Sequence, residues 1–264
     1  MANETTEIWK EKLQHCLIAY DYISEPRGMK VNEVIGGKYV VPMPAYIDLK
    51  ARNVNIGFMF AEAAWILEGS NRLEDLTPHI AGYARFSDDD VFMRGAYGPK
   101  VVDQLGYVVD SIIEDNDTRQ AVLNIWRERP GKGKDIPCTI SLQFLLRQGK
   151  LHTIATMRSN DVVLGFTYDV FTFSMITLAV SLLLKARGVE SALGDLHVNA
   201  GSLHLYDNFY EKAQLWVEAN DTCQEVHKCV DEVLGRASTY IELITLLREG
   251  AENAKRNNST KQRK

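Results

Sequence analysis

The chain has 264 residues, 45% of them hydrophobic, and a formal net charge of −5. An acidic chain lacks the basic surface that nucleic-acid binding requires, so we expect no nucleic-acid partner. Four scattered cysteines are too few for a disulfide framework and indicate reduced thiols in a cytoplasmic protein. The first residues lack the apolar core of a signal peptide, and no uninterrupted apolar run reaches the roughly 18 residues of a membrane span.

Several segments have the apolar spacing of helices. Residues 8–23 and 101–113 are amphipathic, and residues 61–67, which precede Gly69, predict a more fully buried helix. A long helix is predicted from residue 222 to residue 248.

Other segments, rich in β-branched and aromatic residues, predict strands. They are residues 38–41, 121–126, 139–146, 151–157 and 197–206. The third and fourth are joined by the short turn RQGK, which contains Gly149 and predicts a hairpin. Helices and strands alternate irregularly, so we expect an α/β (α+β) protein with a mixed sheet.

The chain shows no linker rich in Pro, Gly or Ser that would divide it. Residues 1–250 are therefore expected to form a single domain. The polar residues 251–264 are expected to be a disordered tail.

Three segments carry residues suited to chemistry. Cys138 follows a proline at the entry to a strand, where a side chain can be held rigidly, although a free cysteine alone is more often an inert core residue. Arg158 and Ser159 provide a cation and a hydroxyl that suit a phosphate, unless Arg158 forms a surface ion pair. His204 and Tyr206 are two apart on a strand, so both point to one face, to bind a sugar hydroxyl or simply to pack.

In this order the segments PCTISLQF, RSNDVVLG and HLY resemble the catalytic motifs of the thymidylate synthase family. Weaker similarity extends to EAAWILEG, GAYG, DNDTRQAVLNIW and EPRG, so that residues 10–215 are covered. The resemblance implies the family's fold, a large mixed sheet flanked by helices, and a homodimer that forms sheet to sheet. Residues 1–250 would then be its catalytic domain.

The resemblance implies a set of catalytic residues. Cys138 would be the nucleophile that adds to C6 of a pyrimidine ring. Glu62 would organise water and proton transfer near the base, and Tyr97 would line the site and assist removal of the C5 proton. The alternatives are an exposed helix charge for Glu62 and core packing for Tyr97.

The resemblance also implies substrate contacts. The nucleotide phosphate would be held by Arg27, Arg158 and Ser159, with Arg119 reaching across from a second subunit. His204 and Tyr206 would contact the 3′-hydroxyl, and Asp161 would bind the pterin ring of a folate. In the alternative readings, Asp161 is a turn residue and Arg119 an ordinary solvated residue.

Asp169 departs from the family pattern, which has an asparagine that pairs with uracil. Cytosine presents the reverse hydrogen-bonding edge at N3 and the 4-amino group, which a carboxylic acid can match. The local alternative for Asp169 is the N-cap of an apolar helix over residues 170–186. Two further departures are Thr139, where synthases have histidine, and Gln120, which replaces the second of two paired arginines.

With these departures the chain resembles the deoxycytidylate hydroxymethylases of bacteriophages. The resemblance implies transfer of a one-carbon unit from 5,10-methylenetetrahydrofolate to C5 of dCMP, with capture by water. The alternatives are a thymidylate synthase or dUMP hydroxymethylase, a CMP hydroxymethylase, and a catalytically inactive nucleotide-binding protein. No metal is expected, because Cys223 and Cys229 lie on opposite sides of a predicted helix and cannot share an ion with His227.

Overall fold

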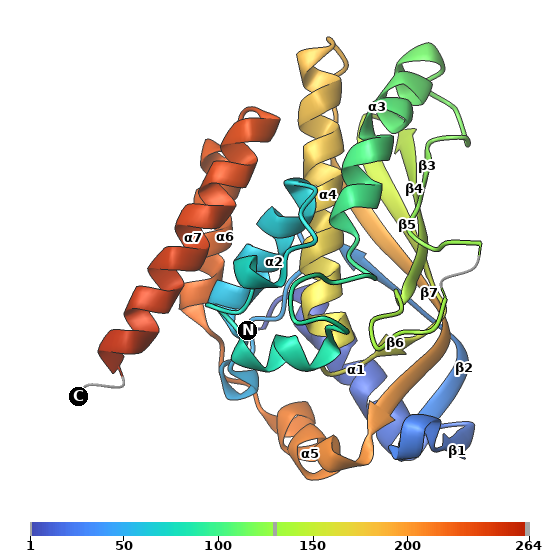
Figure 1. The fold of residues 1–264 in the computed structure, drawn as a ribbon, viewed down its shortest axis with the longest axis vertical. Helices are drawn as coiled ribbons and strands as arrows, with labels where there is room; N and C mark the ends of the chain where they lie inside the picture. Colours follow the sequence, from blue (N-terminus) through green and yellow to red (C-terminus); the bar gives the residue numbers. More distant parts are fainter. Residues whose placement is uncertain (1, 129–130, 262–264) are drawn as a thin grey trace.

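A mixed seven-stranded sheet forms one side of the molecule (Figure 1). The computed structural model describes residues 2–128 and 131–261, with side chains up to residue 256. The strand order is β1-β2-β7-β5-β4-β3, and β6 pairs with β7. The strands are β1 (Tyr22–Ser24), β2 (Val31–Pro42), β3 (Val122–Asn124), β4 (Thr139–Arg147), β5 (Lys150–Met157), β6 (Asn160–Asp161) and β7 (Ala192–Tyr206). The mixed sheet predicted from the sequence is thus confirmed.

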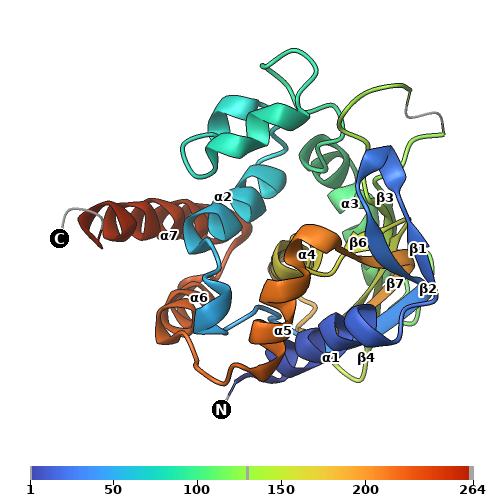
Figure 2. The ribbon, with the colours of Figure 1, turned by 90° about the horizontal axis from the view of Figure 1, so that it is seen from below.

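The helices gather on one side of this sheet (Figures 1 and 2). They are α1 (Glu4–Ile18), α2 (Ile56–Leu67), α3 (Gly98–Glu114), α4 (Gly165–Ala186), α5 (Tyr210–Glu218), α6 (Gln224–Arg236) and α7 (Tyr240–Lys261). Helices α1, α3 and α4 contact the strands directly, and α2 lies between α4 and α7. In the described part of the chain, no helix covers the opposite face of the sheet (Figure 2).

Two connections determine how the central strands β4, β5 and β7 pair with one another. Strands β4 and β5 pair antiparallel through a tight turn in which Gln148 (φ 52°) and Gly149 (φ 73°) are both left-handed, which confirms the predicted hairpin. Strands β5 and β7 are parallel, so the chain must cross over between them, and α4 makes that crossover.

Helix α4 is the core helix of the molecule. It is long and apolar enough to cross a membrane by composition, but 78% of its apolar window is buried inside the protein. Its apolar side chains therefore face the sheet and the neighbouring helices.

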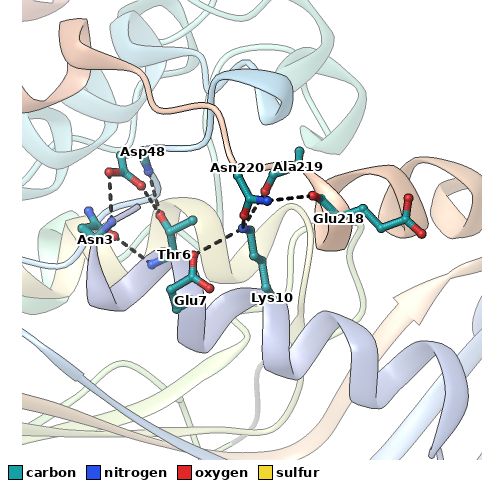
Figure 3. A network of polar contacts seen from close by, with 8 residues as sticks. All are labelled: Asn3, Thr6, Glu7, Lys10, Asp48, Glu218, Ala219 and Asn220. Carbon is teal, nitrogen blue, oxygen red and sulfur yellow. Dashed lines mark hydrogen bonds and ion pairs between the residues drawn. The ribbon is translucent and has the colours of Figure 1, made fainter. Parts of the chain in front are cut away.

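The first helix begins earlier than the spacing of apolar residues predicts, at Glu4 instead of residue 8. Asn3 caps it by accepting a hydrogen bond from Thr6 N at 2.8 Å. Buried Asp48 accepts a hydrogen bond from Thr6 Oγ1 at 2.6 Å, and Lys10 Nζ donates to Ala219 O at 2.6 Å (Figure 3). These contacts fix α1 to the segment before α2 and to the end of α5.

Two expectations for the carboxy-terminal region are wrong. The single helix predicted over residues 222–248 is broken into α6 and α7, because Thr239 Oγ1 accepts from Glu242 N and Glu242 accepts from Ser238 N, a capping arrangement that starts a new helix. The tail expected to be disordered from residue 251 is helical up to residue 261, and Ala251 and Ala254 are buried.

Candidate active site

Cys138 lies immediately before β4, next to two polar side chains from the segment that follows β5. Its Sγ lies 3.6 Å from Ser159 Oγ and 3.6 Å from Arg158 Nη2. The guanidinium is held in place by two backbone oxygens, since Nε donates to Pro137 O at 2.8 Å and Nη2 to Ile136 O at 2.9 Å. The structure thus brings together Cys138 and the pair Arg158 and Ser159, which lie in two separate motifs of the sequence.

Burial and the neighbouring polar groups have opposite effects on the pKa of the Cys138 thiol. Burial raises the pKa of the Cys138 thiol, whereas the nearby Arg158 cation and the Ser159 hydroxyl lower it. Burial is the larger effect, so the thiol keeps its proton at neutral pH in the free protein. A cation beside the sulfur nevertheless stabilises the thiolate when it forms.

Tyr97, at the start of α3, touches Thr139, the residue that follows Cys138. Its Oη accepts hydrogen bonds from Thr139 N at 3.2 Å and Thr139 Oγ1 at 3.0 Å. Burial raises the pKa of Tyr97 well above its usual value, and the charges of Asp169 and Cys138 raise it further. Tyr97 therefore lies close to both of these groups.

Two carboxyl groups, Glu62 and Asp169, are close enough for the charge of one to affect the other. Burial raises the pKa of Glu62 to about 7, and Tyr83 Oη donates a hydrogen bond to its Oε1 at 3.5 Å. Burial also raises the pKa of Asp169 well above its usual value, with the charges of Glu62 and Asp161 as additional causes. Glu62 can thus take or release a proton near neutral pH, and burial favours the neutral acid at Asp169.

Asp169 does not cap a helix. Helix α4 begins at Gly165, one turn earlier than expected, so Asp169 lies inside it and the N-cap alternative is wrong. The helix entry is stabilised instead by Asp161, whose Oδ1 accepts hydrogen bonds from Val163 N at 2.7 Å and Leu164 N at 3.1 Å. Asp161 therefore stabilises a turn, as the alternative hypothesis for this residue predicts.

His204 and Tyr206 share one face of β7, as predicted. Their rings meet edge to face with centroids 5.2 Å apart, and Leu203 and Leu205 are buried on the other face. His204 on β7 lies opposite Asp161 in the register of the neighbouring strand β6. The buried Nδ1 of His204 has no hydrogen-bond partner among the described residues. A ligand hydroxyl could satisfy this nitrogen.

The two remaining arginines are exposed. Arg27, in a tight turn after β1 with a left-handed φ of 56°, lies near Tyr206, whose pKa it lowers against the larger effect of burial. Arg119 lies in the turn before β3, where its backbone oxygen accepts a hydrogen bond from Gln143. The structure does not bring Arg119 into the cluster around Cys138.

Sequence reasoning missed three side chains of this region: Tyr39, Tyr83 and Asn160. Asn160 donates to Asp169 Oδ2 at 2.9 Å, and Tyr39 Oη donates to Asn160 Oδ1 at 3.0 Å. The signal for Asn160 was its place between Ser159 and Asp161. Tyr39 and Tyr83 come from distant segments, and no local pattern marks them.

The histidine considered for a metal site is already occupied by other partners. His227 bonds Tyr46 Oη through Nδ1 and Asp48 through Nε2, both at 2.8 Å. Among the described residues, the group with metal-ligand spacing is His152, Asp195 and His197, whose ligand atoms lie within 4.8 Å of one another. Asp195 N already donates to His152 Nδ1 at 3.0 Å. That the chemistry needs no metal stays a prediction.

Comparisons with known proteins agree with this arrangement. The family model for thymidylate synthase matches residues 45–226. The deoxyuridylate hydroxymethyltransferase of Bacillus phage SP01 is 32% identical over 230 residues, 79% of this chain and 58% of that protein. The same-named protein of Delftia phage PhiW-14 is 30% identical over 65% of this chain and 51% of its own length.

The chain therefore spans little more than half the length of these relatives. Among solved structures, thermostable thymidylate synthase A from Bacillus subtilis superposes with a TM-score of 0.68, covering 83% of this chain and 87% of that chain at 18% identity. That likeness establishes the fold. Together with the family match, it shows that the chain belongs to the thymidylate synthase family.

Proposed function

We propose that this protein transfers a one-carbon unit to C5 of dCMP and that water completes the product as 5-hydroxymethyl-dCMP. The co-substrate is 5,10-methylenetetrahydrofolate, which supplies the carbon at the oxidation level of formaldehyde. The observation that carries the proposal is a carboxylic acid, Asp169, where the family has an amide, in the region that holds Cys138.

Cys138 starts the reaction in this proposal. Its thiolate adds to C6 of the ring, and the electron pair of the C5–C6 bond makes C5 a nucleophile toward the one-carbon unit. Arg158 stabilises the thiolate from 3.6 Å. Loss of the C5 proton, assisted by Tyr97, breaks the bond between the one-carbon unit and the folate nitrogen, so that tetrahydrofolate leaves and a methylene group double-bonded to C5 remains. Water then adds to that methylene carbon, and the sulfur departs from C6 as thiolate.

Glu62 and the residues around the nucleotide complete the site. A carboxyl with a pKa of about 7 can both take and return a proton at neutral pH, which suits the relay of water and protons near the base. Arg158, Ser159 and Arg27 hold the phosphate. His204 and Tyr206 hold the 3′-hydroxyl, for which the unpartnered Nδ1 of His204 is suited.

Asp161 is proposed to bind the folate. Two backbone N–H groups fix its Oδ1, so the carboxyl has a defined orientation. Ring N–H and amino groups of a pterin are donors, and a carboxylate is an acceptor.

Cytosine suits the acid at position 169. A carboxylic acid offers one donor and one acceptor, and cytosine offers an acceptor at N3 and a donor at its 4-amino group. Both hydrogen bonds persist whether the shared proton lies on the acid or on N3. Uracil pairs only while the acid keeps its proton, because a carboxylate would face O4, which is also an acceptor. A proton on N3 would also make C6 more electrophilic.

The second candidate substrate is dUMP. It is favoured by the printed names of the phage relatives, which are deoxyuridylate hydroxymethyltransferases. The steps at Cys138 are the same, and the neutral form of Asp169 provides the donor that O4 needs.

A direct comparison of the two nucleotides tests the proposal. The protein is incubated with the folate and either dCMP or dUMP, and the nucleotide products are separated and weighed by mass spectrometry. We expect faster turnover of dCMP to a hydroxymethyl product, and a shift of preference toward dUMP in Asp169→Asn. Preference for dUMP in the unmodified protein would select the second candidate, and a methyl product would refute hydroxymethyl transfer.

A homodimer through the uncovered sheet face is proposed as well. Ile35 and Val40 on β2 expose 56% and 47% of their surface, so apolar side chains of the sheet are available to contact a second copy of this chain. In such a dimer Arg119 would act in the partner's site.

A further inference from the structure

A chain of hydrogen bonds from three separate elements ends on Asp169. Tyr39 Oη, on β2, donates to Asn160 Oδ1 at 3.0 Å, and Asn160 Nδ2, on β6, donates to Asp169 Oδ2, on α4, at 2.9 Å. Tyr39 and Asn160 are only 4% and 1% exposed. Water therefore has little access to the first two members of the chain.

The geometry fixes the orientation of the Asn160 amide. Because Tyr39 donates to the amide oxygen, the amide nitrogen faces Asp169. The tyrosine ring is itself fixed by stacking on Phe166, with centroids 4.4 Å apart and an interplanar angle of 27°. Gly165 leaves the necessary space, since a Cβ there would lie 3.0 Å from Asn160 Nδ2 and 3.1 Å from Asp169 Oδ2.

This arrangement makes the two oxygens of Asp169 unequal. Oδ2 accepts a hydrogen bond from Asn160, which favours the carbonyl oxygen of a neutral acid there. The acid proton is thereby confined to Oδ1.

The position of that proton decides which base fits. Cytosine needs the O–H of the acid opposite N3, whereas uracil needs it opposite the 4-position. An acid that can carry its proton on either oxygen would accept both bases, and an acid with a fixed proton accepts one.

We propose that Asn160, oriented by Tyr39, is the positioning residue that sets the preference of this protein between cytosine and uracil nucleotides. The inference rests on the proposed function in one respect, that Asp169 contacts the base. It does not depend on which base is preferred.

The test compares kcat/KM for dCMP and dUMP in the unmodified protein, Asn160→Ala and Tyr39→Phe. The ratio of the preferred to the other nucleotide should fall at least tenfold in Asn160→Ala and by a smaller factor in Tyr39→Phe, which keeps the stacked ring. The matched control is Thr177→Val, which removes another buried hydroxyl from a hydrogen bond on α4, with Thr153, without touching this chain of bonds. Its ratio should stay unchanged.

The outcomes separate the inference from the proposed function. Equal losses for both nucleotides in Asn160→Ala and Tyr39→Phe, with an unchanged ratio, would overturn the inference and leave the function standing. Turnover of neither nucleotide by the unmodified protein would refute the function. If Asn160→Ala fails to fold, Tyr39→Phe decides, and an unchanged ratio in that variant overturns the inference.

Discussion

At the scale of single residues, the sulfur of Cys138 carries the proposed chemistry. Replacing Cys138 by Ala should abolish turnover, because no other group in the cluster can form the bond to C6. Nucleotide affinity, measured by calorimetric titration with dCMP, should stay within about tenfold, since the proposed phosphate and sugar contacts lie on other side chains. Cys229→Ala, a partly buried cysteine of α6, is the matched control and should retain full activity. Turnover by Cys138→Ala would contradict covalent catalysis.

Glu62 gives stability a defined dependence on pH. Its pKa is about 7 in the folded protein, against a usual value of 4.5. Between these values the folded chain holds a proton that the unfolded chain has released, so the free energy of unfolding falls as pH rises through this range, by up to about 3 kcal/mol at about 1.4 kcal/mol per pKa unit. Below pH 4.5 Glu62 is protonated in both the folded and the unfolded chain, so none of this free energy of unfolding is lost.

Replacing Glu62 by Gln should remove this loss. In urea unfolding the variant is expected to be more stable than the unmodified protein at pH 8 and nearly equal to it at pH 4, because a neutral glutamic acid resembles glutamine. The same stability difference at both pH values would show that the carboxyl does not titrate as described.

Much of the residue-level site was predictable. Cys138, Arg158 and Ser159 lie in motifs whose order and content identify the family, and the structure brings them together. Tyr39 and Asn160 were not predictable as a pair, because they lie 121 positions apart and meet only through the sheet. The position of Asp169 within α4 also depended on where the helix begins, which local propensity defines poorly.

At the scale of elements, the pairing of α2 with α7 supports the helix that carries Glu62. Gly250 of α7 lies directly against Phe60 of α2, and a Cβ at this glycine would lie 2.6 Å from Phe60 Cδ1. Phe60 is fully buried and stacked on Phe171, so a displacement of its ring would disrupt the packing of the core.

We therefore expect opposite effects from the same substitution at two helical glycines. Gly250→Ala should lower the free energy of unfolding by about 1–3 kcal/mol through overpacking. Gly106→Ala, in α3 with open space around it, should raise it by about 0.5–1 kcal/mol through helix propensity. Urea unfolding of both variants measures the difference. Stabilisation by Gly250→Ala would show that the two helices are not packed this closely.

The elements themselves were partly foreseen. The hairpin of β4 and β5 followed from a short turn with a glycine, and the buried helix α2 from its largely apolar residues, although it begins at Ile56 instead of residue 61. The break between α6 and α7 was missed, although Ser238, Thr239 and Glu242 form a recognisable capping signal. Apolar spacing continued across the break, and it dominated the prediction.

At the scale of the whole molecule, the uncovered sheet face and the exposed Arg119 lead to a test of the proposed dimer. Cys138→Ala and Arg119→Ala are each inactive or impaired alone, if Arg119 acts in the partner's site. Mixed under conditions that exchange subunits, they should recover about a quarter of normal activity, because half the dimers are mixed and each holds one intact site. Mass spectrometry of tagged subunits shows whether the subunits have exchanged. If they have and no activity is recovered, Arg119 does not act in the partner's site.

The most direct measurement of the central claim follows the oxygen of the product. The protein is incubated with dCMP and the folate in water enriched in oxygen-18, and the nucleotide product is weighed by mass spectrometry. The account predicts a hydroxymethyl product that carries the heavy oxygen from the unmodified protein and none from Cys138→Ala. A methylated nucleotide, or hydroxymethyl product from Cys138→Ala, would contradict it.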